Sequence, residues 1–250
     1  SPMGHIARYL PQGIQERGRE IRTFMPKFGN INERRNQLHE VIRLSGMNLI
    51  IDDTDNPLII KVASIQSARM QIYFIDNEDF FQRKYVFRDK NNIFYSDNDE
   101  RAIFFSRGVL ETVKKLGWPP DVVHCHGWMT SFMPIYIKKA YHENPLLSNT
   151  KVVLSIYDDH FDETLDANIT NKIKHEGISA KDLKHYKKPT FANIMKAGID
   201  FADGIIVGSP VINSEVHEYA LQSGKPMLEY QPEETFVDTY NEFYDRILSA

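Results

Sequence analysis

Asp121-Val-Val-His-Cys-His-Gly-Trp-Met-Thr130 carries the clearest structural signal in this chain. Its β-branched and apolar residues predict a strand over Val122–Cys125, and a helix is expected directly after it, over Thr130–Tyr141. Polar and aromatic residues fill the junction between the two. In an open parallel sheet, ligands bind outside the carboxyl ends of the strands, where loops meet helix N-termini. The 121–130 stretch therefore predicts a binding site at this junction.

Strands and helices alternate on both sides of this stretch. Further strands are predicted at Val152–Tyr157 and Gly204–Val207. Helices are predicted from Asp97 or Asn98 to Gly117, over Phe191–Phe201, and over Phe236–Leu248. Such alternation implies parallel crossover connections between neighbouring strands. We therefore predict an α/β fold with a three-layer, doubly wound, mostly parallel sheet.

The first part of the chain predicts a helix and then a cluster of strands. Ile6, Leu10 and Ile14 recur at helical spacing between Gly4 and Gly18. The strands are predicted at Glu20–Met25, Val41–Ile51, Leu58–Ala63 and Gln71–Ile75. A turn at 52–57 joins two of them, so we expect a small antiparallel hairpin beside the parallel strands.

In the last third of the chain, the alternation of predicted strands and helices is less regular. Ser209-Pro210 is expected to open a helix, with serine as N-cap and proline in the first turn, and Pro226–Tyr230 to form a last strand. Residues 160–188 are polar and irregularly patterned, which indicates either an inserted helical excursion or a mobile loop. We expect a single domain over 1–250, with this excursion and a terminal helix at 236–250.

Composition narrows the classes of function. The formal net charge of −4 gives no broad basic surface, so nucleic acid and anionic membranes are not expected partners. No run approaches the ~20 apolar residues that span a bilayer, and a cytoplasmic location is expected. The single cysteine, Cys125, excludes an internal disulfide and is expected to be buried and inert. Without a compact Cys/His set, neither a metal site nor a cofactor is expected.

Several separate motifs resemble one known family, and they occur in the family's order. The run Asn193–Pro210 resembles L-K-A-G-L-x-x-A-D-x-x-x-x-V-S-P, and Asp97-Asn98 with Arg101 matches T-D-N-x-x-R-F. The 121–130 stretch is similar to D-V-V-H-A-H-D-W-H. These motifs belong to the N-terminal lobe of the bacterial glycogen and starch synthases. The resemblance implies a Rossmann-like lobe of a two-lobed glycosyltransferase that transfers glucose from ADP-glucose to an α-1,4-glucan.

The chain departs from the family at the turn before the first helix. The family has K-x-G-G-L there, with the lysine on the donor diphosphate. Aligned on Gly4, the chain has Pro2 in place of that lysine and His5 in place of the second glycine. Gly4 is expected either to let the backbone approach a phosphate or only to make a tight strand-to-helix turn. In the family a central strand precedes this helix, so we expect an upstream strand in the natural protein, or another segment in its place.

The 121–130 stretch has also lost polar groups. Gly127 replaces the family's aspartate and Met129 its final histidine, both of which would contact sugar or nucleotide. Trp128 is expected either to stack on a sugar ring or to pack under the following helix. His124 is expected to be a satisfied buried histidine, whereas His126 faces the cleft in one interpretation and the interior in the other.

The next strand shows a third departure. Its end resembles the family's T-x-H-N, with Tyr157 in place of the histidine that touches the transferred glucose and Asp158 in place of the asparagine. Tyrosine can hydrogen-bond a sugar hydroxyl but cannot supply an imidazole. Asp158 and Asp159 together either do acid–base work or are solvated turn residues. The ligand-cleft candidates are Gly4, His5, His126, Gly127, Trp128, Tyr157, Asp158 and Ser209, and no catalytic residue is assigned.

Three classes of function follow. In the first, a glycogen synthase-like domain is catalytically degenerate alone, because one lobe cannot enclose a donor and exclude water. Such a domain would bind an α-glucan or a nucleotide sugar, or have a regulatory role. In the second, an active glucosyltransferase is completed by a separate second lobe; a homo-oligomer is the other expected assembly. In the third, a small-molecule enzyme reuses the fold, and His126, Tyr157 and Asp158 converge on one pocket.

Overall fold

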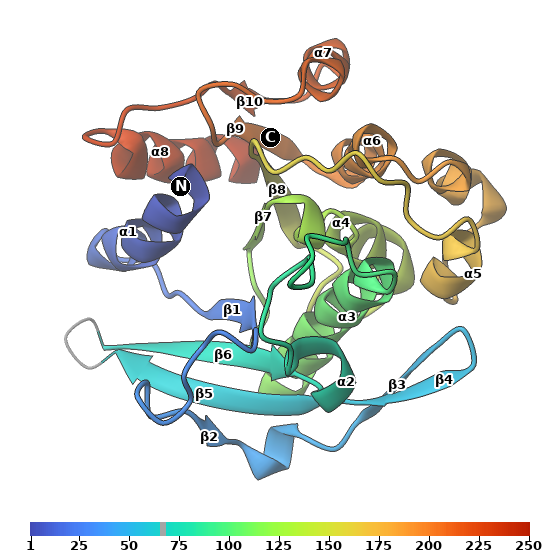
Figure 1. The fold of residues 1–250 in the computed structure, drawn as a ribbon. Helices are drawn as coiled ribbons and strands as arrows, with labels where there is room; N and C mark the ends of the chain where they lie inside the picture. Colours follow the sequence, from blue (N-terminus) through green and yellow to red (C-terminus); the bar gives the residue numbers. More distant parts are fainter. Residues whose placement is uncertain (66–68) are drawn as a thin grey trace.

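The computed structural model describes residues 1–65 and 69–250 (Figure 1). Its strands are β1 (Thr23–Pro26), β2 (His39–Glu40), β3 (Asn48–Ile51), β4 (Thr54–Pro57), β5 (Ile59–Ile65), β6 (Met70–Asp76), β7 (Val122–His126), β8 (Lys151–Ile156), β9 (Gly204–Val207) and β10 (Met227–Leu228). Its α-helices are α1 (Pro2–Glu16), α2 (Glu78–Phe81), α3 (Asn98–Leu116), α4 (Met133–Ile135), α5 (Ile169–Ile173), α6 (Phe191–Phe201), α7 (Ser214–Gln222) and α8 (Phe236–Leu248). The remaining helical turns are η1 (Ile42–Leu44), η3 (Trp128–Thr130), the π-helical η4 (Tyr136–Ala140) and η5 (Ala180–Lys187).

One four-stranded sheet, in the order β10-β9-β8-β7, is parallel throughout. Residues 152–156 of β8 are all buried, because helices cover both faces of the sheet. Val153 packs in a cluster with α1 and α8, whereas Leu154 packs in a second cluster with α3, α4 and α6. Figure 1 shows these two groups of helices on opposite sides of β7 and β8. The predicted three-layer α/β architecture is confirmed.

The other four-stranded sheet, in the order β1-β6-β5-β2, is mixed. β1 pairs with β6 in parallel, but β5 pairs antiparallel with both β6 and β2. The small antiparallel hairpin is β3–β4, which turns at Asp52 and Asp53, both with positive φ. Aspartate tolerates this left-handed conformation better than most residues, so a two-residue turn suffices. The second strand of the hairpin, Thr54–Pro57, lies inside the predicted turn at 52–57. The predicted partner strand Leu58–Ala63 instead falls largely in β5, which pairs with β6 and β2, so the predicted pairing of the hairpin was wrong.

Two further predictions were wrong. Val41–Ile51 is not one strand, because η1 interrupts it and pairing begins only at Asn48. Ser209-Pro210 does not open a helix. The N-cap of α7 is Asn213, whose side chain accepts the N–H of Val216 at 3.1 Å. By contrast, α6, β9 and α8 have the predicted bounds, and Asp97 and Gly117 flank α3 as expected.

The segment 160–188 is helical where the structure gives it regular form, in α5 and η5. Ile169, Ile173 and Tyr186 are fully buried against the main cluster. Lys172 forms an ion pair with the buried Asp99 of α3 at 2.8 Å. These are the contacts that a helical excursion packed against the core would make.

β1 and β7 are the edge strands of their sheets. In the described residues, no strand pairs with the outer edge of either one. The upstream or substitute strand expected from the sequence therefore stays a prediction. Among residues 1–65 and 69–250, no helix combines the length and the apolar character needed to cross a bilayer.

Candidate functional site

The candidate site lies where β7, β8 and β9 end. Because the three strands are parallel and in register, their last residues come side by side. The N–H of Gly127 donates to the carbonyl of Ser155 at 3.1 Å, and the N–H of Gly208 donates to that of Ile156 at 2.7 Å. We call this region, with His126, Gly127, Tyr157–Asp159 and Ser209, the carboxyl edge. The strand order thus brings together segments that are far apart in the sequence.

His126 and Tyr157 form a bonded pair at this edge. His126 Nδ1 lies 2.7 Å from the Tyr157 hydroxyl. Burial lowers the pKa of His126 to about 4 and raises the pKa of Tyr157, so both side chains are neutral near pH 7. The Tyr157 ring also fills the space in front of Gly208, where a Cβ would lie 2.5 Å from it. Tyr157 is therefore packed into the interior, and His126 is half-buried beside it.

His124 is a satisfied histidine, as expected. Its ring nitrogens lie 2.6 Å from the Tyr244 hydroxyl and 2.6 Å from Ser155 Oγ, and its ring stacks on His126 with centroids 3.9 Å apart. Burial lowers its pKa well below the usual value. The Cys125 thiol is buried and its pKa is raised to about 12, which makes it inert.

Trp128 packs in the interior, but its ring contacts are with aromatic residues of other segments, whereas the sequence interpretation placed it under the following helix. Its side chain is only 2% exposed. Its ring lies 4.9 Å from Phe87, 5.1 Å from Phe161 and 6.3 Å from Phe94, measured between centroids. A sugar could not stack on this ring unless the aromatic cluster opened.

Gly127 and Asp159 meet at the edge in a way that the sequence did not predict. Gly127 has φ 85° and ψ 174°, a conformation that is almost restricted to glycine. A Cβ there would lie 2.8 Å from Asp159 Oδ2 and 2.6 Å from Met3 Cε. Asp159 Oδ2 accepts the N–H of Trp128 at 2.9 Å, while its Oδ1 is buried without a partner among the described residues.

The carboxyl of Asp159 has an unusual pKa. Desolvation raises it to about 6, although the N–H of Trp128 opposes the shift. In the sequence, Asp159 stands out only as the neighbour of Asp158. A signal was present: the glycine that replaces the family's aspartate at 127 and the extra aspartate at 159 follow neighbouring strands.

Asp158 and Ser209 have structural contacts. The N–H of Asp158 donates to Ser209 Oγ at 3.0 Å, and Ser209 is only 2% exposed. The carboxylate of Asp158 is 64% exposed and lies 3.7 Å from His160 Nδ1. Asp158 therefore does not converge on one pocket with His126 and Tyr157, which argues against the small-molecule enzyme.

Gly4 and His5 lie inside α1, so the strand-to-helix turn expected at Gly4 was wrong. Ser1 is the N-cap and Pro2 occupies the first turn, and the N–H of Gly4 donates to Ser1 Oγ at 3.2 Å. The ring of His5 lies 5.7 Å from that of Phe236, and His5 Nδ1 is 3.9 Å from a Glu233 oxygen. Across the described residues, no three His, Cys, Asp or Glu side chains are grouped to hold a metal ion.

Comparisons with known proteins agree on one family. The family model described as the starch synthase catalytic domain matches residues 2–228. A glycogen synthase of Chlorobium limicola is 35% identical over 217 residues, covering 86% of this chain and 44% of that protein. One of Pelodictyon phaeoclathratiforme is 32% identical over 235 residues, covering 92% and 47%.

A solved structure has the same fold. The catalytic domain of Starch Synthase IV from Arabidopsis thaliana, bound to ADP and acarbose, superposes with a TM-score of 0.74 at 18% identity, covering 92% of this chain and 48% of that one. The chain thus spans about half the length of the relatives that it matches.

Proposed function

Since the chain belongs to the starch synthase catalytic domain family, we propose that this glycogen synthase-like lobe binds an α-glucan at its carboxyl edge and is catalytically degenerate alone. Glucosyl transfer from ADP-glucose would require charge stabilisation on the leaving diphosphate. Enzymes supply it with preorganised cations and hydrogen-bond donors. The proposal therefore depends on which charges the carboxyl edge carries.

The observation that carries the proposal is the sign of these charges. His126 and Tyr157 are neutral, and the ionisable groups that remain among the edge residues are the carboxyls of Asp158 and Asp159. Two like charges 4 Å apart repel by about 4 kcal/mol at an effective dielectric constant of 20. A diphosphate beside these carboxylates is disfavoured, whereas the hydroxyls of a glucan can donate hydrogen bonds to them.

The solved relative supports both ligand classes, since it is bound to ADP and acarbose. Our proposal ranks the carbohydrate above the nucleotide sugar for this chain. We also propose that a second lobe or a second copy of the chain is its partner and that the cytoplasm is its compartment. Light scattering on the purified chain, alone and with a candidate second lobe, tests the assembly.

Isothermal titration calorimetry tests the binding proposal. The chain is expected to bind maltoheptaose, to bind ADP-glucose more weakly, and to transfer no labelled glucose to glycogen. Asp158→Asn should weaken maltoheptaose binding because one of the two exposed acceptor oxygens is replaced by an NH2 donor and the negative charge is lost. Asp121→Asn, at the other end of β7, is the matched control and should change nothing. Absence of heat with either ligand would contradict the binding proposal, and transfer by the chain alone would contradict degeneracy.

A further inference from the structure

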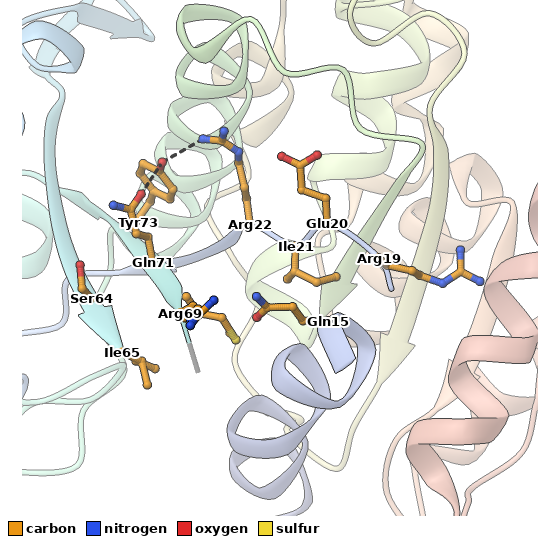
Figure 2. Close-up of a pocket in the computed structure, with 11 residues that line it drawn as sticks. Gln15, Arg19, Glu20, Ile21, Arg22, Ser64, Ile65, Arg69, Gln71 and Tyr73 are labelled. Carbon is orange, nitrogen blue, oxygen red and sulfur yellow. Dashed lines mark hydrogen bonds between the residues drawn. The ribbon is translucent and has the colours of Figure 1, made fainter. Parts of the chain in front are cut away.

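A cavity of about 550 Å³ lies away from the carboxyl edge, and none of the ligand-cleft candidates lines it. It is bounded by the end of α1, the segment that leads into β1, and the adjoining ends of β5 and β6 (Figure 2). Its volume falls within the range of about 300–1,000 Å³ that is typical of small-molecule sites. Its charged lining is mostly cationic, with Arg19, Arg22 and Arg69 against the single carboxylate of Glu20.

Arg22 is held in place without being neutralised. Its guanidinium lies 5.1 Å from the ring of Trp118 and 6.0 Å from that of Tyr73. It donates a hydrogen bond of 2.9 Å to the Tyr73 hydroxyl (Figure 2). Aromatic faces and a neutral hydroxyl orient a guanidinium but leave its charge uncompensated. Within residues 1–65 and 69–250, no carboxylate lies within ion-pair distance of it.

The two other arginines differ from each other. Arg19 pairs with Asp245 at 2.6 Å and bonds Asn241 at 2.6 Å, so its charge is matched. Arg69 is exposed and has no ion pair in the part of the chain that the structure describes. Arg22 and Arg69 thus supply the unmatched positive charge, which focuses the field in a concave site.

Gln15 adds an unsatisfied acceptor. Its Oε1 is buried and has no hydrogen-bond partner among the described residues, which is costly unless a ligand or water supplies a donor. Figure 2 shows Gln15 and Arg69 extending toward each other across the cavity. Ser64 and Gln71 place further polar groups on the wall. The cavity therefore offers cations together with neutral groups that suit hydroxyls.

We propose that this cavity binds a small phosphorylated carbohydrate, with Arg22 and Arg69 on the phosphate and Gln15 accepting from a sugar hydroxyl. Guanidinium groups match phosphate oxygens in charge and in geometry. The cavity is separate from the glucan site proposed above, and the inference does not depend on that function.

Calorimetry on the full chain with glucose 1-phosphate tests the inference, with glucose and inorganic phosphate as comparison ligands. Glucose 1-phosphate should bind more tightly than either. Arg69→Gln should weaken binding by about tenfold or more, the usual effect of losing a charge-assisted hydrogen bond. Arg35→Gln, at another exposed arginine, is the matched control and should bind like the parent.

Two further measurements separate charge from geometry. Arg22→Lys keeps the charge but loses the planar group, so it should also bind more weakly. Affinity should rise between pH 5.5 and 7.5, because a phosphate monoester gains its second charge near a pKa of about 6. Equal binding of glucose, or parent-like binding by both arginine variants, would overturn the inference. Maltoheptaose titrated into the same variants reports separately on the carboxyl edge.

Discussion

Gly127→Ala is expected to destabilise the fold by about 2.5–6 kcal/mol, for two reasons. The backbone at Gly127 has φ 85° and ψ 174°, where a residue with a Cβ pays about 1–3 kcal/mol. The new Cβ would also lie 2.8 Å from Asp159 Oδ2, which accepts the Trp128 N–H. Displacing that carboxylate weakens a charged hydrogen bond, which contributes about 1.5–3 kcal/mol.

The matched control is Gly117→Ala. Gly117 also has a positive φ, 62°, but an added Cβ would meet no atom within 4 Å, so only the left-handed backbone penalty of about 1–2 kcal/mol applies. Urea unfolding followed by circular dichroism should show a lower midpoint for Gly127→Ala than for Gly117→Ala, with the slope m unchanged. In thermal unfolding, each kcal/mol corresponds to about 2–4 °C at this chain length. Equal or greater damage in Gly117→Ala would refute the reasoning about the Asp159 contact.

Three other expectations concern charge and packing. The folded-state pKa of Asp159 is raised from 3.8 to about 6, so the folded state holds the proton more tightly than the unfolded state does. The free energy of unfolding should therefore fall by up to about 3 kcal/mol as pH rises from 4 to 6. In a series of urea unfolding curves over this pH range, Asp159→Asn should remove most of the fall, and an unchanged profile would contradict the burial argument. Lys172→Ala leaves the buried carboxyl of Asp99 without its partner and should cost about 3–5 kcal/mol in urea unfolding, against less than about 0.5 for the exposed Lys181→Ala. Trp128→Phe should lower the free energy of unfolding by about 1–3 kcal/mol but leave maltoheptaose affinity unchanged in calorimetry; an affinity loss in a variant that stays folded would mean that the ring contacts the sugar.

Local patterns predicted the parallel half of the fold well. β9, α6 and α8 have the expected bounds because each buries a stripe or run of apolar residues that is visible in a short window. Parallel pairing then fixed the side at which the strands end together. The position of the carboxyl edge could therefore be inferred from the sequence alone.

The features that the sequence did not predict depend on contacts between residues far apart in the chain. Trp128 is buried by Phe87, Phe94 and Phe161, which come from separate segments, and no local pattern shows that they converge. Ser209 looked like a helix cap, but its hydroxyl accepts the N–H of Asp158 from the neighbouring strand end. In both cases, a contact with a residue distant in sequence determines where the side chain lies, and the local sequence pattern does not.

Helix α8 packs against the sheet and also contacts a residue next to the carboxyl edge. It lies beyond residue 228, where the family match ends, yet Phe236, Tyr240 and Phe243 are buried against α1 and the sheet. Full burial of such side chains contributes about 1.5–3 kcal/mol each. Tyr244 faces inward with its hydroxyl 2.6 Å from His124 Nδ1, and His124 in turn stacks on His126. An apolar residue at 244 would leave His124 Nδ1 without a hydrogen-bond partner. The amphipathic pattern of α8 therefore includes a polar group, the Tyr244 hydroxyl, opposite His124. The neutral His126–Tyr157 pair at the carboxyl edge thus rests on a helix that lies outside the residues matched by the family model.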